Sequence, residues 1–106
     1  MVQIRVRYVS DSIQDFIKSL DKRTRIACRE AVAALAIYGN ELTMPLSKNI
    51  GNGLFELRVK EIANIRIIYT FYLNSAWILH VFEKTSNRIS KNDMAICLKR
   101  KRMLLA

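Results

Sequence analysis

The sequence predicts an α+β fold in which helices pack on one side of a small, mainly antiparallel sheet. A strand-like segment and two helical segments come first, three strand-like segments with short turns follow, and one helical segment ends the chain. The expected order is β-α-α-β-β-β-α, in one domain over residues 1–106, because a chain of this length buries about one core. We expect the opposite face of the sheet to be free for binding.

Alternation and capping residues predict the N-terminal elements. Residues 4–9 alternate in character, as in a short strand, and Ser10 and Asp11 can cap a short helix that runs through Lys18. Asp21 can cap a second helix that ends about Tyr38, before Gly39 and Asn40. In that helix one buried stripe is expected at spacings of three and four, with arginines left toward solvent: Cys28, Ala31, Val32, Leu35 and Tyr38, against Arg23, Arg25 and Arg29.

From residue 40 onward, the sequence predicts a loop, three strands and a helix. Residues 40–53 contain Pro45 and two glycines and predict a loop. The expected strands are Leu54–Lys60, Ile65–Leu73 and Ala76–Lys84, joined by hairpin turns near Ala63-Asn64 and Asn74-Ser75. The last helix is expected to start at Ser90, with Asp93 completing a capping-box-like pair, and to end in the basic run Lys99–Arg102.

The composition points to an anionic partner in a reducing compartment. Eighteen Lys and Arg against nine Asp and Glu give a formal net charge of +9, which favours a polyanion or an acidic protein that relieves the repulsion. A plain basic domain is the alternative. Cys28 and Cys97 belong to no disulfide or metal motif, so we expect buried thiols. Residues 1–8 do not resemble a signal peptide and the longest apolar run, 31–38, is short, which predicts a cytoplasmic protein.

Strand alternation brings basic side chains onto one face. Arg58 shares its parity with Leu54 and Glu56, and Arg66 lies opposite in parity to Ile65, Ile67 and Tyr69. Lys84 shares parity with His80 and Phe82 in the next strand. Like charges repel at close range, so a cluster of Arg58, Arg66 and Lys84 predicts a bound phosphate. The alternative is that Arg58 forms a surface salt bridge with Glu56 or Glu61.

Other candidate groups have simpler interpretations. His80, the single histidine, could serve as an acid or base, but its apolar strand favours a packed side chain. Tyr69 is expected in the core, whereas Tyr72 and Phe82 could either pack or stack on unpaired bases. No nucleotide-binding, metal-binding or catalytic-triad motif occurs in the sequence, so we expect no metal and no cofactor.

Residues 46–99 resemble the RelE/HigB toxins of toxin–antitoxin systems, in particular their phage-derived HigB-like branch. The motifs are "G-L-x-E-L-R", "R-I-x-Y" and "F-x-K", in this order and spacing: Gly53 to Arg58, Arg66 to Tyr69, and Phe82 to Lys84, preceded by Leu46-Ser47-Lys48-Asn49-Ile50. The chain departs from that branch at Thr85, where a second lysine is usual, and at Ile89-Ser90, where Thr-Pro is common.

The resemblance implies a RelE-like fold and a metal-independent endoribonuclease, an mRNA interferase that cuts messenger RNA at the ribosome and so inhibits translation. It implies that Arg66 contacts the scissile phosphate and that Arg58 and Lys84 flank it. Our hypothesis for Lys84 is proton transfer or charge stabilisation. Basic residues expected to bind RNA or the ribosome are Lys48, Arg88, Lys91, Lys99 and Arg100, with Arg23, Arg25 and the rest of the run 99–102.

The expected partners are messenger RNA on the ribosome, ribosomal RNA and a cognate antitoxin, HigA-like and either acidic or DNA-binding. Two alternatives stay open. ParE toxins share this fold, which allows a non-enzymatic inhibitor of DNA gyrase. An inactive RNA-binding relative is the other, and the departures at Thr85 and Ile89 favour it mildly.

Overall fold

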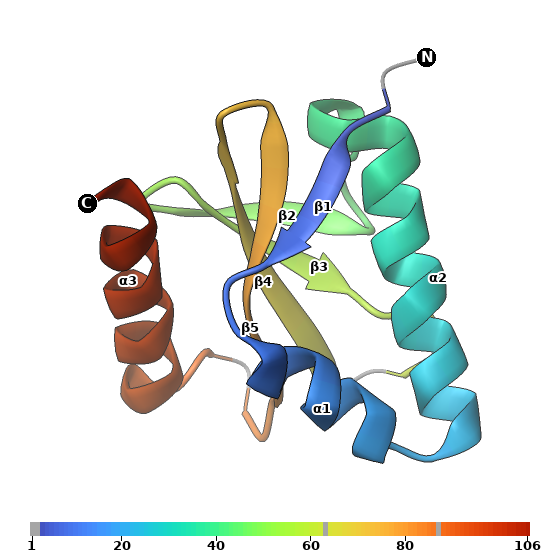
Figure 1. Ribbon diagram of the computed structural model, residues 1–106. Coiled ribbons are helices and arrows are strands. Elements are labelled where there is room, and N and C mark those ends of the chain that lie inside the picture. The colour runs from blue at the N-terminus through green and yellow to red at the C-terminus, as the bar shows by residue number, and fades with distance from the viewer. Residues whose placement is uncertain (1–2, 63, 87) are drawn as a thin grey trace.

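A computed structural model describes residues 3–62, 64–86 and 88–106 and contains one five-stranded sheet in the order β1-β5-β4-β3-β2 (Figure 1). β1 is parallel to β5, and every other neighbouring pair is antiparallel. The predicted α+β class is therefore confirmed. The elements are β1 (Arg5–Tyr8), α1 (Asp11–Ser19), α2 (Lys22–Tyr38), a 3-10 turn (Gly39–Glu41), β2 (Ser47–Gly51), β3 (Leu54–Arg58), β4 (Ile65–Tyr72), β5 (Ser75–Glu83) and α3 (Lys91–Leu105).

All three helices begin at the predicted capping residues. The Ser10 hydroxyl accepts a hydrogen bond from the Ser12 N–H, and the Asp21 carboxylate accepts one from the Thr24 N–H. Ser90 Oγ accepts from the Asp93 N–H at 3.0 Å and donates to Asp93 Oδ2 at 2.8 Å. These bonds satisfy amide groups that the first turn of a helix leaves unpaired. α3 continues beyond the basic run and ends at Leu105.

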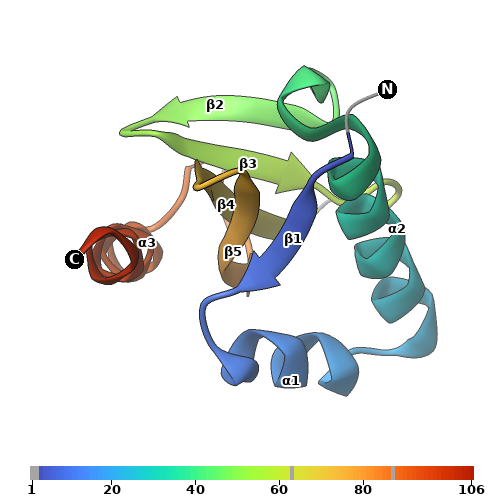
Figure 2. The same ribbon diagram turned by 45° about the horizontal axis from the view of Figure 1, so that its top comes forward.

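α1 and α2 cover one face of the sheet (Figure 2). The buried side chains of this first core include Ile13, Ile17, Cys28 and Leu35 from the helices, and Ile67 and Tyr69 from β4. The prediction that Tyr38 continues the buried stripe is wrong, since it is 51% exposed. Each residue turns a helix by about 100°, so the three-residue step from Leu35 carries Tyr38 to the margin of the stripe.

The expectation that helices gather on one side and leave the other face free is also wrong, because α3 packs on the opposite face (Figure 2). Cys97 of α3 lies in a second core with Leu54, Ile68, Leu79 and Phe82. The physical reason is visible in β4, where the neighbours Ile67 and Ile68 point to opposite faces and are both fully buried. A strand that is apolar on both faces needs cover on both.

The prediction of a continuous loop over residues 40–53 is wrong in its second half. Residues 47–51 form β2, an edge strand in which Ser47 pairs with Leu57 of β3. The Ser47 hydroxyl lies 2.5 Å from the Tyr69 hydroxyl, so the edge strand is tied to the first core. The glycines that suggested a loop belong to the β2–β3 turn instead, where Gly51 and Gly53 have φ of +91° and +73°.

The hairpin turns match their predictions where the structure describes them. Leu73 and Asn74 both have positive φ and join β4 to β5, one residue before the predicted Asn74-Ser75 turn. Of the other predicted turn, Ala63-Asn64, the first residue lies outside the described residues. β5 contains a bulge, because Ile68 pairs with His80 whereas Tyr69 pairs with Ile78, which leaves Leu79 as the additional residue.

In the part of the chain that the structure describes, no helix is both long enough and apolar enough to cross a membrane. The two thiols are buried as expected, each with 0% exposure. Burial raises the pKa of both, and that of Cys97 reaches about 12.

The buried thiols predict slow chemical modification of the folded protein. A thiol reacts as its thiolate, so Cys28 and Cys97 should be protected both by burial and by their raised pKa. Titration with a disulfide reagent such as DTNB at pH 8 should release almost no thiolate from native protein, and two equivalents after unfolding in urea. Rapid reaction of the native protein would contradict the described core.

Candidate active site

The register of β3, β4 and β5 places the predicted basic residues on the face that α3 partly covers. Arg58 of β3 lies directly opposite Arg66 of β4, and Arg66 lies opposite Phe82 of β5. Lys84 follows the end of β5, where its N–H donates to the Asn64 carbonyl at 2.5 Å. The predicted convergence of Arg58, Arg66 and Lys84 is thus what the strand pairing produces.

A buried carboxylate, Glu56, lies at the centre of these cations. Glu56 Oε1 is 3.3 Å from Arg66 Nε and 3.9 Å from Arg58 Nε, and Oε2 is 3.5 Å from Lys84 Nζ. The Glu56 side chain is 3% exposed, Arg66 and Lys84 are 14% and 15% exposed, and Arg58 is 38% exposed. Three positive charges against one negative charge leave a net formal charge of +2, so the cluster still attracts an anion.

Glu56 is the residue of this site that the sequence reasoning left out. The alternative interpretation of Arg58 as a salt-bridge partner of Glu56 describes a contact that is present, but the same carboxylate also binds Arg66 and Lys84. The available signal was parity: Glu56 alternates with core residues and shares the face of Arg58. An acidic residue on a face that gathers cations is a natural counter-ion.

His80 is a packed residue, as its apolar strand suggested. The imidazole is 15% exposed, its ring lies 5.1 Å from that of Phe82, and Nε2 is 2.8 Å from Asp93 Oδ1 in the first turn of α3. Burial alone would raise the pKa of Asp93, but hydrogen bonds from His80 and Ser90 lower it below its usual value. This contact ties α3 to β5 beside the cation cluster.

The structure brings only some of the predicted RNA-binding residues to this site. Lys48 is exposed on β2 and lies opposite Glu56 in the strand register, so it extends the basic face across the edge strand. Arg88 and Lys91 are exposed between β5 and the first turn of α3. Arg100 instead donates to the Leu79 carbonyl at 2.7 Å and supports the bulge, while Lys99 is exposed on another flank of α3.

The remaining candidates lie elsewhere. Tyr69 is 1% exposed in the first core, as expected, and Phe82, for which both packing and stacking were open, is 6% exposed in the second core. Tyr72 is partly buried at the opposite end of β4 from Arg66. Arg23 is exposed on α2, in the layer across the sheet, and Arg25 donates to the Leu20 carbonyl at 3.1 Å. Arg23 nevertheless lines the same groove as Arg58, at the end of β3.

A RelE-like toxin class is consistent with these strands and with the cluster between them. Residues 15–102 match the family described as Phage derived protein Gp49-like (DUF891), and the chain belongs to that family. This is a HigB-like toxin family in the RelE superfamily, so membership suggests a toxin. The resemblance to the phage-derived branch is thereby supported at the level of the family. A search of curated proteins finds no match for the chain.

Removal of the central carboxylate should destabilise the protein. Glu56→Gln leaves three cations facing one another in a poorly hydrated site, which should cost about 3 kcal/mol of unfolding free energy. Urea unfolding followed by circular dichroism measures this loss. The matched control is Glu61→Gln on an exposed residue, which should change stability by less than about 0.5 kcal/mol. Equal effects of the two variants would contradict a central role for Glu56.

The tie between α3 and β5 should weaken in acid. Because the folded-state pKa of Asp93 is below its usual value of 3.8, its contribution is present above that value and is lost as pH falls through the folded-state pKa. Asp93→Ala should lower stability by about 1–2 kcal/mol at pH 6, and the difference should shrink below pH 3. Urea unfolding at both pH values tests this. Asp15→Ala, on exposed α1, should show no such pH-dependent difference.

Proposed function

We propose that this protein is the toxin of a toxin–antitoxin pair and acts as a ribosome-dependent, metal-independent mRNA endoribonuclease. The observation that carries the proposal is the cluster of Arg58, Arg66 and Lys84 on one sheet face, with a net positive charge around one buried carboxylate. Membership of a HigB-like toxin family supports the same class of activity. A protein that only inhibits gyrase has no need of this cluster.

The proposed reaction transfers the scissile phosphate to the RNA's own 2′-oxygen. The 2′-hydroxyl attacks the adjacent phosphorus in line, the bond to the 5′-oxygen breaks, and a 2′,3′-cyclic phosphate and a 5′-hydroxyl result. One proton leaves the attacking oxygen and one reaches the leaving oxygen. Negative charge builds up on the phosphorane, and preorganised cations stabilise it.

The cluster can supply that stabilisation. In the proposal Arg66 contacts the scissile phosphate, Arg58 flanks it, and Lys84 stabilises charge or carries a proton. Glu56 acts as a positioning residue, because its two oxygens bind cations from three different segments and it is only 3% exposed. A guanidinium that is already oriented loses less side-chain entropy when phosphate binds, which favours the transition state.

The ribosome would supply what the site lacks. The cluster contains cations and one enclosed carboxylate rather than a matched acid and base, so a message held in the reactive geometry would help catalysis most. Lys48, exposed on the edge strand opposite Glu56, could bind ribosomal RNA, as could the exposed Arg88 and Lys91. A cognate antitoxin is the second proposed partner, since a net charge of +9 favours an acidic surface.

The test adds purified protein to a translating extract and maps new 5′ ends on a reporter mRNA. Cuts should fall within translated codons, and Arg66→Ala should reduce them about 100-fold or more because it removes a charge at the phosphate. Lys84→Ala should also reduce cutting strongly. Arg5→Ala, which removes an exposed arginine from β1, should cut like the unchanged protein.

Two results would contradict the proposal. One is normal cutting by a folded Arg66→Ala variant, and the other is intact mRNA in the presence of folded, unchanged protein. In the second case a DNA supercoiling assay would show whether the protein inhibits gyrase instead.

A further inference from the structure

α3 has two adjacent stripes of side chains, and only one of them packs on the second core. Met94, Cys97 and Leu98 face that core, and the Lys101 ammonium donates to the Asn52 carbonyl in the β2–β3 turn. The second stripe recurs at spacings of three and four and lines a groove beside the helix: Ile96, Lys99, Arg100, Met103 and Leu104. Apolar residues on both stripes indicate that the helix has two surfaces to cover.

The groove lies between this second stripe and the edge of the sheet formed by β5 and the end of β1. Its volume is about 620 Å³, and Val9, Ser10 and Trp77 complete the lining. Five of the eight described lining residues are apolar, two are basic and none is acidic. Met103 is 66% exposed and Leu105, two residues further on, is 52% exposed. Two large apolar side chains at the end of α3 therefore face water, which is unusual.

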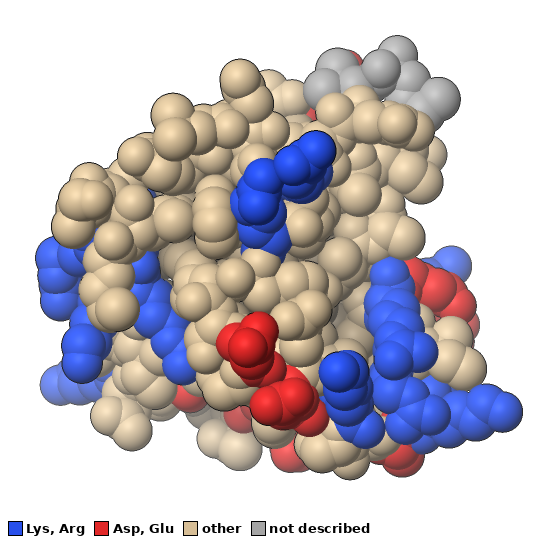
Figure 3. All heavy atoms as spheres, viewed as in Figure 1, with Lys and Arg blue, Asp and Glu red and all other residues tan. Residues whose placement is uncertain are grey.

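Charge adds a second constraint on what fits this groove. Lys99 and Arg100 line it, and the Arg7 guanidinium lies 5.7 Å from the centre of the Trp77 ring. In Figure 3, Lys and Arg side chains gather over α3, over β1 and near the junction of α1 and α2, whereas Asp and Glu side chains lie over α1, beside α2 and along the lower edge. An apolar floor with a basic rim is complementary to an apolar segment that carries carboxylates.

We propose that this groove binds an acidic amphipathic helix from a partner protein. The helix would place aliphatic side chains against Trp77, Ile96 and Met103, and carboxylates beside Lys99 and Arg7. The cation cluster lies beside the Phe82 end of β5 and Lys84, whereas Trp77 is near the other end of that strand, so this surface is separate and peptide binding here does not require RNA cleavage.

A polypeptide fits this lining better than single-stranded RNA. Base stacking needs open aromatic faces, whereas the groove has one aromatic ring with Arg7 already over it, and its other apolar residues are aliphatic. The aliphatic, knob-like side chains Ile96, Met103 and Leu104 are typical of helix-in-groove contacts.

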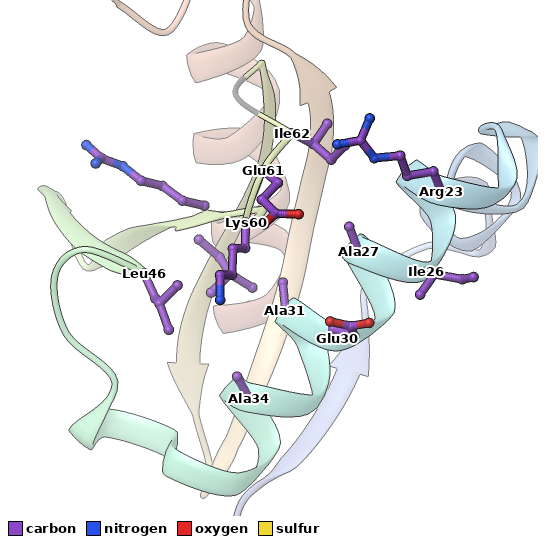
Figure 4. Close-up of a pocket in the computed structure, with 12 residues that line it drawn as sticks. Arg23, Ile26, Ala27, Glu30, Ala31, Ala34, Leu46, Lys60, Glu61 and Ile62 are labelled. Atoms are coloured by element: carbon purple, nitrogen blue, oxygen red, sulfur yellow. The ribbon is translucent and has the colours of Figure 1, made fainter.

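A second groove in the structure lacks this charge pattern and provides a control. It lies between α2 and the end of β3, has a volume of about 430 Å³, and is floored by Ala27, Ala31 and Leu46 (Figure 4). Its charged residues are mixed, with Arg23, Arg58 and Lys60 beside Glu30 and Glu61. An acidic helix should therefore be attracted less strongly to this second groove than to the groove beside α3.

The experiment uses Trp77, the single tryptophan, as a reporter inside the groove. The probe is a synthetic helical peptide of about 18 residues with Leu along one face and Glu on the other. Its binding should shift the Trp77 emission to shorter wavelength with a saturating titration, because water leaves the groove. A peptide of the same composition in scrambled order should bind at least tenfold more weakly.

Matched variants locate the binding. Lys99→Glu and Met103→Ser change exposed side chains of α3 and should each weaken binding about tenfold, while Lys60→Glu and Ile26→Ser in the other groove should leave it unchanged. The proposal is overturned if the peptide leaves Trp77 emission unchanged, or if the two pairs of variants have equal effects. It is also overturned if oligouridine shifts the emission and displaces the peptide, since RNA would then be the better occupant.

Discussion

The arrangement of this protein depends on β4, a central strand whose two faces are both apolar. Ile67 faces the core under α1 and α2, Ile68 faces the core under α3, and both are fully buried. Burying such a strand is favourable only if both faces are removed from water. α3 must therefore lie across the sheet from the N-terminal helices. Its position then divides the second face into a part with the cation cluster and a part with the Trp77 groove.

The candidate site consists of residues on strands rather than on loops. Arg58, Arg66 and Glu56 are held by the register of β3 and β4, so their separation is set by backbone hydrogen bonds of the sheet. A buried ion cluster of this kind contributes little net stability, because desolvation of the charges opposes their attraction. Its value is geometric, since the cations stay oriented in the absence of a ligand.

Much of the fold could be predicted from local patterns. The caps at Ser10, Asp21 and Ser90 and the parity of Arg58 and Arg66 follow from the chemistry of single turns and from strand alternation, and the structure confirms them. The side on which α3 packs could not be predicted in the same way, because it depends on contacts between residues far apart in the chain. β2 was missed because glycines at a tight turn and in a loop look alike in sequence.

Strand parity explains both why the convergence of the three cations could be predicted and why the role of Glu56 could not. Parity places Arg58, Arg66 and Lys84 on one face, but it gives no distances, so a carboxylate shared by three cations cannot be told from one that pairs with a neighbour. The structural use of Arg100 was also beyond the sequence, since its acceptor is the carbonyl of the bulged residue Leu79, 21 positions earlier in the chain.

That bulge also decides which side chains of β5 share a face. Strict alternation would put Trp77 and His80 on opposite sides, but the additional residue, Leu79, restores both to the side of α3. Removal of Leu79 would leave Trp77 and His80 two positions apart, so strict alternation would then keep both on the side of α3. The inserted residue thus adds a fully buried side chain to the second core without turning the rest of β5 over, so loss of Leu79 should cost packing rather than rearrange the sheet.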